Sequence, residues 1–512
     1  MKRGQMVLWT ILMLGGGLNS QAAEFKANII RDGNPLRTLE VEPTAMEVDA
    51  TQAVEEVLLK DFVVRNQVKS SLARTDGQFQ VTSYYGERVE GKSFSEDLRY
   101  EFSDTMFGAV NTAYWMGKLV NEIKAQDFLI KQKMNISVDA HCENKTNAYF
   151  SPIMNAVCLG HLYYTLGKKA LNGAASTAWD ADVSVHELAH GVFHHLNSMP
   201  NVLNRNYFSY GNDLLGALNE GQADYQAHVV TGTDMIAPWF MNMFKAYILK
   251  VNPEAYDSVK EEKGLRNLKS SRTFKNAKDF GGEIHSDGEI FAATFYDLGH
   301  VVGLKKFYKI WLEAISKLTE EDNVHAMAQH LLRADRLLFE GTHQEAMKAL
   351  FETRGWMGNT HHEDAQVLLK VTDTPEEVDQ AINAGRRRGI PWESGAVEPN
   401  GNGRLDPGEC TPIELAIKNN GQSDLVAVEV FFPKSEQPKG LSIATSTRIY
   451  LGVAAGQAIS PQTANRTDIR RPWLYACADE SFDNTQPLKV ILRDATEASP
   501  RVVSVSLETT TL

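Results

Sequence analysis

The chain has 512 residues, enough for two or three domains that each bury a core of their own. Apolar residues make up 43% of the chain and charged residues 23%, the proportions of an ordinary soluble globular protein. The formal net charge of −13 argues against a nucleic-acid partner and against binding to an anionic membrane surface, because an acidic surface attracts neither.

The first 22 residues are typical of a signal peptide. Lys2 and Arg3 precede an uncharged run at Met6–Leu14, and Ser20 and Ala22 are the small residues that signal peptidase requires. The apolar run is too short to span a bilayer, and no other segment has about eighteen consecutive apolar residues. We therefore expect an exported protein (secreted, periplasmic or cell-surface) with no membrane span in its mature form. A buried N-terminal helix is the alternative.

Four cysteines follow the signal, and export permits disulfide bonds. Four cysteines allow three pairings. Their clustering favours Cys142 with Cys158 and Cys410 with Cys477. No CxxC pair occurs, so nothing about the cysteines indicates a metal site.

Residues 23–100 have a mixed pattern. A strand is expected at Phe25–Ile30 and a helix from Ala50 to about Arg65. The region is either a short pro-segment or the first part of a catalytic unit, and the sequence leaves both possibilities open.

Residues 101–393 are expected to form one α+β domain, mixed at its start and mostly helical towards its end. Helical periodicity runs from Ser103 to Ala125, and short strands follow it. Residues 180–390 are mostly helical, with helices at Leu304–Leu318 and Asn323–Phe339. Glycine and proline at 389–395 then indicate a linker.

Residues 394–512 have a different pattern. Ile413, Leu415 and Ile417 alternate with polar residues, as do residues 502–507, and turn residues separate such runs. Short strands at this spacing predict a small all-β sandwich domain.

The segment 185–191, VHELAHG, contains an HExxH pattern. Residues four apart on a helix share a face, so His186 and His190 can reach one ion while Glu187 faces a water molecule. Catalytic zinc takes three protein ligands and keeps one position open, so a third ligand is needed. By itself, the pattern also fits a surface helix that contains two histidines by chance.

The segment 219–224, NEGQAD, offers the third ligand. Glu220 can bind the ion from a later helix, with Asp224 one turn farther on the same side. A ligand histidine usually donates its second ring N–H to a carboxylate, and Asp224 suits that role. A third histidine in the HExxHxxGxxH pattern is excluded because Leu196 stands at that position. His194 and His195 have the wrong spacing and are interpreted as structural.

The segment 281–289, GGEIHSDGE, leads into an apolar helix at Ile290–Leu298. Peptide hydrolysis builds negative charge on the carbonyl oxygen, and a hydrogen-bond donor at that oxygen stabilises the transition state. His285, at the helix entrance, can be that donor.

Together, HELAHG, NEGQAD and GGEIHSDGEIFAATFYDLG resemble the motifs of the thermolysin-like zinc peptidases, and the last is also similar to the fungalysins. The segment 147–150, NAYF, resembles the edge strand with which that family binds the substrate backbone. The resemblance covers roughly residues 75–370, with the four motifs in the family's order. It implies a thermolysin-like catalytic domain.

At matching positions the resemblance implies zinc bound by His186, His190 and Glu220, with Glu187 as general base and His285 stabilising the tetrahedral intermediate.

The resemblance also implies further roles. Asp279 would orient His285, Tyr210 would be a second oxyanion donor, and Asn147 and Ala148 would hold the substrate backbone.

One property of the family is not expected here. Asp182 matches a calcium ligand of the family, but Thr231 and Thr233 stand in the region where further acidic ligands would lie. We therefore do not expect structural calcium in the catalytic domain.

The segment 398–409 has oxygen donors at positions 1, 3, 5, 9 and 12 of a twelve-residue calcium loop and glycine at position 6. The expected Ca²⁺ ligands, with a backbone carbonyl at position 7, are Glu398, Asn400, Asn402, Arg404, Asp406 and Glu409. A turn-rich linker uses the same residue types, and this alternative stays open.

The sequence therefore favours an exported zinc-dependent endopeptidase that acts on protein or peptide substrates. An aminopeptidase would need an acidic cluster to hold the amino terminus of its substrate, and none is identified. A binding protein on an inactive peptidase scaffold would have lost reactive residues, yet all five residues expected to bind zinc or take part in catalysis are present.

Overall fold

The structure is a computed structural model. The residues that it describes are 25–30, 37–39, 47–49, 54–59, 62–65, 71–75, 79–84, 97–98, 105–126, 134–139, 147–166, 169–197, 213–251, 253–276, 279, 284–319, 322–357, 365–371, 402, 404–422, 424–432, 437–443, 449–459, 474–483, 485–494 and 501–505.

The described residues before residue 100 all belong to strands. β1 (Phe25–Ile30) lies between β4 (Val54–Leu59) and β8 (Asp97–Leu98), and β2 (Arg37–Leu39) pairs with β3 (Glu47–Asp49).

The helix expected from Ala50 to Arg65 is wrong, because β4 and β5 (Phe62–Arg65) occupy that range. The range is rich in valine, which favours strands, and pairing with neighbouring strands outweighs the helical spacing of its apolar residues.

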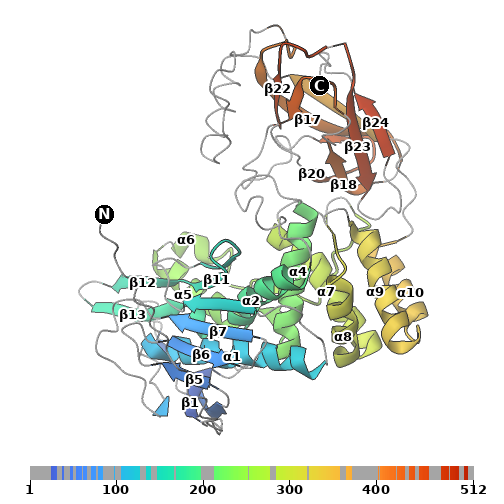
Figure 1. The fold of residues 1–512 in the computed structure, drawn as a ribbon. Helices are drawn as coiled ribbons and strands as arrows, with labels where there is room; N and C mark the ends of the chain where they lie inside the picture. The colour runs from blue at the N-terminus through green and yellow to red at the C-terminus, as the bar shows by residue number, and fades with distance from the viewer. Residues whose placement is uncertain are drawn as a thin grey trace, which may run out of the picture.

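A six-stranded sheet forms one side of the larger unit (Figure 1). Its strand order is β10 (Ala148–Ser151), β11 (Ala156–Leu159), β9 (Met134–Asp139), β7 (Phe79–Tyr84), β6 (Ser71–Thr75) and β5. β9 is parallel to both of its neighbours, and the other adjacent pairs are antiparallel. Among the described strands β10 is at the edge. Three strands that precede residue 100 thus complete the sheet to which β10 belongs.

Helix α1 (Thr105–Ala125) packs against β6 and β7 of this sheet and against α2 (Ala181–Leu196). Asn111 donates hydrogen bonds to the carbonyl oxygens of Ala178 (3.0 Å) and Trp179 (3.2 Å), in the 3₁₀ turn η2 (Thr177–Trp179). The hairpin of β12 (His161–Leu166) and β13 (Lys169–Ser176) precedes this turn. The start of α2 is thereby fixed to α1.

Two buried aspartates fix the N-terminus of α2. Asp180 caps the helix by accepting from the backbone N–H groups of residues 182 and 183. Asp182 accepts from the hydroxyls of Thr231 (2.7 Å) and Thr233 (3.0 Å) and from the N–H of Ala237 (3.0 Å). Burial raises the pKa of Asp180 to about 6 and that of Asp182 to about 7. Thr231 and Thr233, which stand in the region considered for further calcium ligands, thus donate hydrogen bonds to Asp182.

Helix α4 (Asp213–Thr231) lies between α2 and α7 (Ile284–Val302) and contacts both (Figure 1). Gly221 of α4 and Gly288 of α7 meet at the crossing. A Cβ atom on Gly288 would lie 2.7 Å from the Cβ of Glu220, and one on Gly221 would overlap the carbonyl oxygen of Gly288. Only glycine at both positions allows the two backbones to approach this closely.

The remaining helices complete the core. Two short strands, β14 (Met235–Ile236) and β15 (Arg266–Asn267), pair with each other. Helices α5 (Pro238–Val251) and α6 (Pro253–Tyr256) lie between them in the sequence. Helices α8 (Leu304–Ile315), α9 (Val324–Phe339) and α10 (Gln344–Arg354) follow α7. Observed α8 and α9 begin within one residue of the predicted starts. Their buried apolar faces join one continuous core with α1, α2, α4 and α7.

The C-terminal part has two sheets, which form a separate lobe in Figure 1. One contains β16 (Ala365–Val371), β17 (Cys410–Asn419), β22 (Leu474–Ala478) and β19 (Leu441–Ile443), with β21 (Ala458–Ile459) beside β17. The other contains β20 (Ile449–Val453), β18 (Leu425–Phe431), β23 (Leu488–Asp494) and β24 (Arg501–Val505). Side chains of both sheets share one buried cluster. β16 pairs along its whole length with β17, so this lobe includes a strand upstream of the boundary at residue 394.

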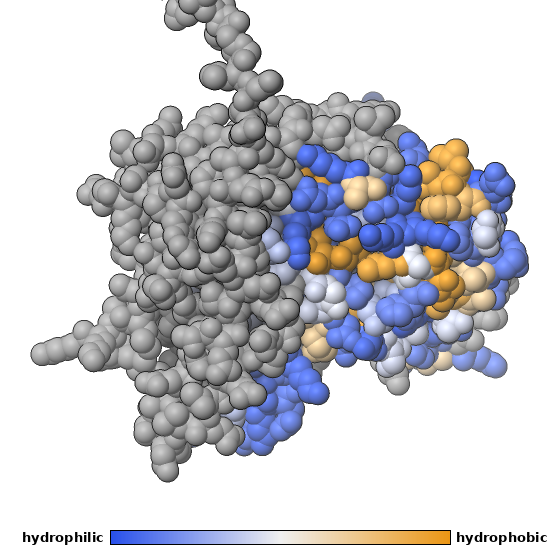
Figure 2. All heavy atoms as spheres, turned by 90° about the horizontal axis from the view of Figure 1, so that it is seen from below, coloured by the Kyte–Doolittle hydropathy of each residue, from blue (hydrophilic) through white to orange (hydrophobic). Residues whose placement is uncertain are grey.

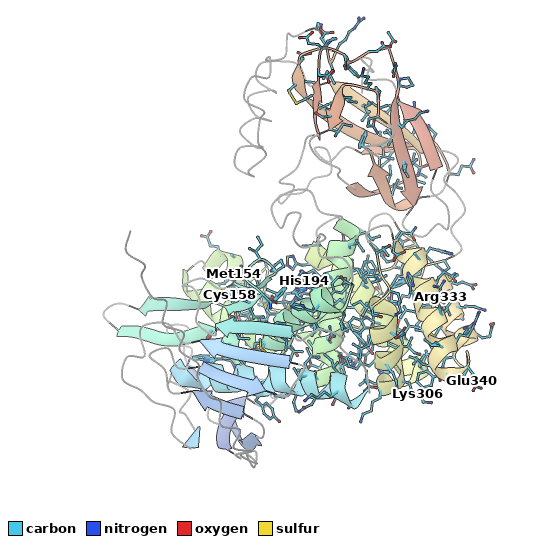
Figure 3. All side chains as sticks on the ribbon, in the orientation of Figure 1. Met154, Cys158, His194, Lys306, Arg333 and Glu340 are labelled. Carbon is cyan, nitrogen blue, oxygen red and sulfur yellow. A yellow bond between two sulfur atoms is a disulfide. The ribbon has the colours of Figure 1, made fainter. Side chains whose placement is uncertain are left out.

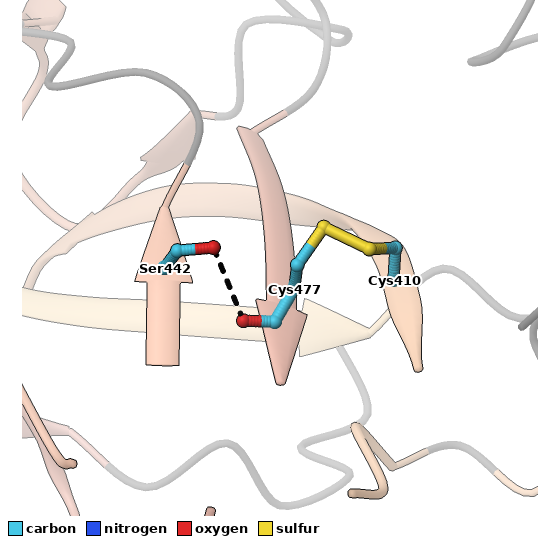
Figure 4. The surroundings of a disulfide bond; sticks show 3 residues. All are labelled: Cys410, Ser442 and Cys477. Carbon is cyan, nitrogen blue, oxygen red and sulfur yellow. Dashed lines mark hydrogen bonds between the residues drawn. A yellow bond between two sulfur atoms is a disulfide. The ribbon is translucent and has the colours of Figure 1, made fainter. Parts of the chain in front are cut away.

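A disulfide bond joins Cys410 of β17 to Cys477 of β22, the pair that the sequence favours (Figure 4). The two residues are directly opposite in the strand register, and Ser442 of β19 donates to the carbonyl oxygen of Cys477 (3.4 Å). Cys158 on β11 is also disulfide-bonded, and its predicted partner Cys142 lies outside the described residues.

The visible described surface in Figure 2 is mainly hydrophilic, with smaller apolar patches between the polar groups. Within the described residues, no helix is both long and apolar enough to cross a membrane.

The close approach of Gly221 and Gly288 predicts that one methyl group added at this crossing destabilises the protein. Gly288→Ala should push α7 away from α4 and lower the free energy of unfolding by about 1–3 kcal/mol, as overpacking does. Gly299→Ala on the same helix is the matched control: its Cβ would meet atoms only at 3.5 Å and beyond, and it should be neutral or stabilising by up to about 1 kcal/mol. Chemical denaturation of both variants tests this. Equal stability would contradict the close crossing.

Candidate metal centre

His186 and His190 project from the same face of α2, one helical turn apart. Their Nε2 atoms lie 3.0 Å from each other, and both residues are buried. Gly191, the next residue, brings α2 against the sheet: a Cβ there would lie 2.6 Å from the Cδ1 of Ile136. Packing on one side of α2 therefore directs the two imidazoles to the other side, towards α4.

Glu220 reaches the two imidazoles from α4. Its Oε2 lies 3.2 Å from the Nε2 of His186, and its Oε1 lies 3.6 Å from the Nε2 of His190. One ligand atom from each of the three residues lies within 4.8 Å of the other two. Among the described residues, this is the one group of at least three His, Cys, Asp or Glu side chains that meets this criterion.

The donor set fits a zinc ion. The separations of 3.0–3.6 Å are close to those between donors that each lie about 2.0–2.2 Å from one ion. Glu220 is buried, and a buried carboxylate is costly unless a cation compensates its charge. Two imidazoles and one carboxylate are also a typical ligand set of catalytic zinc.

Asp224 orients His186, as the sequence predicts for a ligand histidine. The Nδ1 of His186 lies 2.8 Å from Oδ1 of Asp224. Burial lowers the pKa of His186, but hydrogen bonds to Asp224 and Glu220 outweigh it and raise that pKa to about 10. Binding of an ion at Nε2 therefore displaces a proton.

Arg266 of β15 was not identified from the sequence. It donates two hydrogen bonds to Asp224, from Nε (2.5 Å) and from a terminal nitrogen (2.6 Å). Burial raises the pKa of Asp224, but the charge of Arg266 outweighs this effect, so the net pKa is lowered. The bidentate pair therefore keeps a fully buried carboxylate ionised beside His186.

Asn219 orients the second histidine and was also missed. Its Oδ1 lies 3.0 Å from the Nδ1 of His190 and accepts a hydrogen bond from Gln222 (3.0 Å). The position directly before a glutamate ligand could have suggested a role for Asn219. Arg266 had no comparable signal, because it lies 80 residues from His186 along the chain.

Glu187 lies beside the three donor side chains and lines the same cleft. It is buried, and burial raises its pKa to about 7, although the charge of His186 acts in the opposite direction. A carboxylate with a pKa near neutrality can take up a proton and release it again.

His285 stands in the first turn of α7, with a side chain that is 52% exposed. Its Nε2 lies 3.6 Å from Oε1 of Glu220 and faces the cleft. The glycine contact between α4 and α7 sets this distance.

Polar and apolar side chains both line the cleft. The polar ones include the residues described above and Arg266. The apolar ones include Val183, Ile236, Ala237, Phe240 and Leu265.

Asn147 and Ala148 lie along one border of the cleft, where β10 forms the edge of the described sheet. Asn147 is fixed by a hydrogen bond from the N–H of Gly160 to its carbonyl oxygen (2.8 Å). Ala148 pairs with Leu159 of β11. The edge strand β10 and the three donor side chains therefore border the same cleft.

The described contacts of the Asp279 side chain lie within its own turn. Its carboxylate accepts from the N–H of Thr273 (3.2 Å) and from the side chain of Asn276 (3.0 Å), and within the described part of the chain it has no bond to His285. Both donors lie within six residues of Asp279 in the sequence, so the carboxylate stabilises the local turn. The predicted oxyanion donor Tyr210 lies outside the described residues.

His194 and His195 face away from the three ligands. His194 packs on Phe150 of β10, with ring centroids 5.9 Å apart, and His195 bonds to Asn155 (2.8 Å) in the β10–β11 turn. Figure 3 labels His194 together with Met154 and Cys158 of that hairpin.

Four of the six predicted calcium ligands are described, and Glu398 and Asn400 lie outside the described residues. Asn402 donates to the carboxylate of Asp406 (2.6 Å) and accepts from the N–H of Arg404 (2.8 Å). Glu409 is buried and accepts from the N–H of Asp406 (2.9 Å). Three side chains with oxygen donors therefore gather within one short turn.

No protein-family model matches the chain, and a search of curated proteins finds no match either.

The geometry predicts that Asp224 and Asp279 differ in importance for metal binding. Asp224→Asn should weaken zinc binding by about ten- to a hundredfold, because His186 loses the carboxylate that orients it. Asp279→Asn, the matched control, should leave zinc affinity unchanged. Competition with a chromogenic chelator measures both affinities. A zinc affinity of Asp224→Asn equal to that of the unmodified protein would contradict the role of Asp224.

Proposed function

We propose that the protein is an exported zinc-dependent endopeptidase with a thermolysin-like catalytic domain. The observation that supports this most directly is the convergence of His186, His190 and Glu220 on one point, with Glu187 beside them in the same cleft. The signal-like residues 1–22 and the disulfide bonds support export.

When bound, zinc supplies a Lewis acid that polarises the peptide carbonyl and lowers the pKa of a water molecule. Glu187 takes the proton from the attacking water and transfers it to the nitrogen of the leaving amine. Its carboxylate lines the cleft beside the three donor side chains, within reach of a reacting group. Glu187 does not bind the metal in this scheme, because the ligand set is complete without it.

His285 stabilises the oxyanion that develops on the carbonyl. It is a side-chain donor at the cleft, next to the ligand Glu220. The substrate backbone lies along β10 and forms hydrogen bonds with residues 147 and 148, as in strand addition to a sheet edge. The apolar side chains of the cleft then contact one substrate side chain. A protein or peptide in extended conformation meets all of these contacts.

The two alternatives find less support. An aminopeptidase needs free carboxylates to hold the amino terminus of its substrate, and Glu187 and Glu220 are the two carboxylates among the described residues that line the cleft. A binding protein on an inactive scaffold has no need of a buried base, of oriented ligand histidines or of the Asp224–Arg266 pair.

We also infer that the turn at residues 402–409 is part of a calcium-binding loop that stabilises the C-terminal lobe. The support is the cluster of Asn402, Asp406 and Glu409, which brings oxygen donors together at the start of β17.

Two substitutions distinguish the proposed general base, Glu187, from the proposed zinc ligand Glu220. Glu187→Gln should abolish cleavage of a generic protein substrate but retain bound zinc, because Glu187 moves protons and does not bind the ion. Glu220→Ala should lose both the zinc and the cleavage. Metal analysis and a protease assay on the same preparations measure the two effects. A tenth of the normal activity in Glu187→Gln, or full zinc occupancy in Glu220→Ala, would overturn the mechanism.

Calcium should stabilise the folded C-terminal lobe in the full-length protein. An ion that binds only the folded state adds about 2.7 kcal/mol at a hundredfold excess over its dissociation constant. A thermal unfolding curve should therefore shift upward in millimolar calcium chloride but not in magnesium chloride, and Glu409→Gln should remove the shift. The absence of any calcium-dependent shift would leave the turn as a linker.

A further inference from the structure

A continuous line of hydrogen bonds runs through the core from α8 to the ligand histidine His190. Tyr308 donates to Oε1 of Gln226 (3.1 Å), and Nε2 of Gln226 donates to Oε1 of Gln222 (2.7 Å). Nε2 of Gln222 donates to Oδ1 of Asn219 (3.0 Å), which lies 3.0 Å from the Nδ1 of His190. Tyr308 and both glutamines are completely buried, and Asn219 is 5% exposed.

A backbone carbonyl gives this line its direction. Nε2 of Gln222 also donates to the carbonyl oxygen of Ala189 on α2 (3.4 Å). A carbonyl oxygen can only accept, so the nitrogen end of the Gln222 amide must face α2 and Asn219. Asn219 must then present its oxygen to Gln222. In the opposite orientation, two amide nitrogens would face each other in a buried site, which is costly.

The orientation of Asn219 decides where His190 holds its proton. The Oδ1 of Asn219 is an acceptor, so the Nδ1 of His190 must be protonated and its Nε2 presents a lone pair. That lone pair faces the Nε2 of His186 and the carboxylate of Glu220. If Asn219 turned over, its nitrogen would favour the other tautomer, and the proton on Nε2 would occupy the place of the ion.

We propose that Gln222, Gln226 and Tyr308 are positioning residues that select the metal-binding tautomer of His190 through Asn219. The proposal rests on the proposed function, because it takes His190 as a zinc ligand. His186 is oriented by an ionised carboxylate, whereas His190 is oriented by neutral groups whose order of donors and acceptors is fixed from α2.

Burying the polar side chains of this line costs hydration free energy, which apolar side chains of the same volume would not. A buried amide loses its hydration, so each member is stable only while its donors and acceptors remain paired. Leucine or methionine would fill the same volume without this requirement. The polar side chains are therefore accounted for by the orientation that they impose on His190.

Two substitutions of Gln222 distinguish orientation from packing. Gln222→Met keeps the length of the side chain but removes its donor, so the Asn219 amide is no longer held in one orientation. Gln222→Glu keeps the shape, and at a pH above the pKa that burial raises, its ionised carboxylate only accepts and therefore attracts the nitrogen of Asn219. Packing predicts that the near-isosteric glutamate is the milder change, and our proposal predicts the reverse order.

Thr294→Val is the matched control on α7. Thr294 is completely buried and accepts a hydrogen bond from Trp356 (3.0 Å), and it has no bond to the line from Tyr308 to His190. Its replacement should lower the melting temperature without changing zinc affinity. Tyr308→Phe removes only the terminal hydroxyl and serves as a second test if the Gln222 variants fail to fold.

Zinc affinity is measured by chelator competition on the full-length protein, with ¹⁵N spectra of labelled histidine in the metal-free protein as an independent readout. Gln222→Met should weaken zinc binding by about ten- to a hundredfold, Gln222→Glu by more, and Tyr308→Phe by less. In the unmodified protein, the His190 signal should report a proton on Nδ1. In Gln222→Glu that proton should move to Nε2.

The outcomes separate this proposal from the proposed function. If the unmodified protein binds no zinc, the proposed function fails, and the histidine spectra still test the tautomer. If it binds zinc and both Gln222 variants bind it equally well, the proposed role of the line is overturned. It is also overturned if Thr294→Val weakens zinc binding as much as Gln222→Met does, or if Tyr308→Phe leaves both zinc affinity and the His190 spectrum unchanged.

Discussion

The close packing of α4 between α2 and α7 is the constraint on which the rest of the site depends. Gly221 and Gly288 let the backbones of α4 and α7 touch, and this contact places Glu220 opposite the two histidines of α2 and beside His285 of α7. A single added methyl group at the crossing would move the third ligand and the candidate oxyanion donor apart. The geometry of the candidate metal centre is therefore set by backbone contact between helices, and its three donor side chains all stand on helices.

Two stripes of side chains on α4 serve the two histidines separately. Residues 220 and 224, four apart, supply the third ligand and the carboxylate that orients His186. Residues 219, 222 and 226, spaced by three and four, form the amide line that ends at His190. Both stripes reach α2, through Glu220 and Asp224 to His186 and through Asn219 to His190, so one helix supplies the third candidate ligand and contacts both of the others.

The sequence predicted the local parts of this site and missed the parts that depend on tertiary contacts. Helical periodicity alone relates His186 to His190 and Glu220 to Asp224, because each pair lies one turn apart. Arg266 reaches Asp224 from a distant two-residue strand, and no local pattern marks it. The helix expected at 50–65 failed for the same reason, since pairing with β1 and β6 determines that conformation. Asp279 was assigned to His285 by resemblance, whereas its nearest donors lie within its own turn.

The difference between the partners of the two histidines follows from the charges around Glu187. The carboxylate of Glu220 already contributes to the raised pKa of Glu187, although burial contributes more. Asp224 adds a second negative charge near His186, and Arg266 neutralises it through two hydrogen bonds. A carboxylate on His190 would add a third charge without such a partner and would raise the pKa of Glu187 further. The amide of Asn219 contacts the ring of His190 without adding charge, so the pKa of Glu187 stays at about 7 while both candidate ligands keep a hydrogen-bond partner.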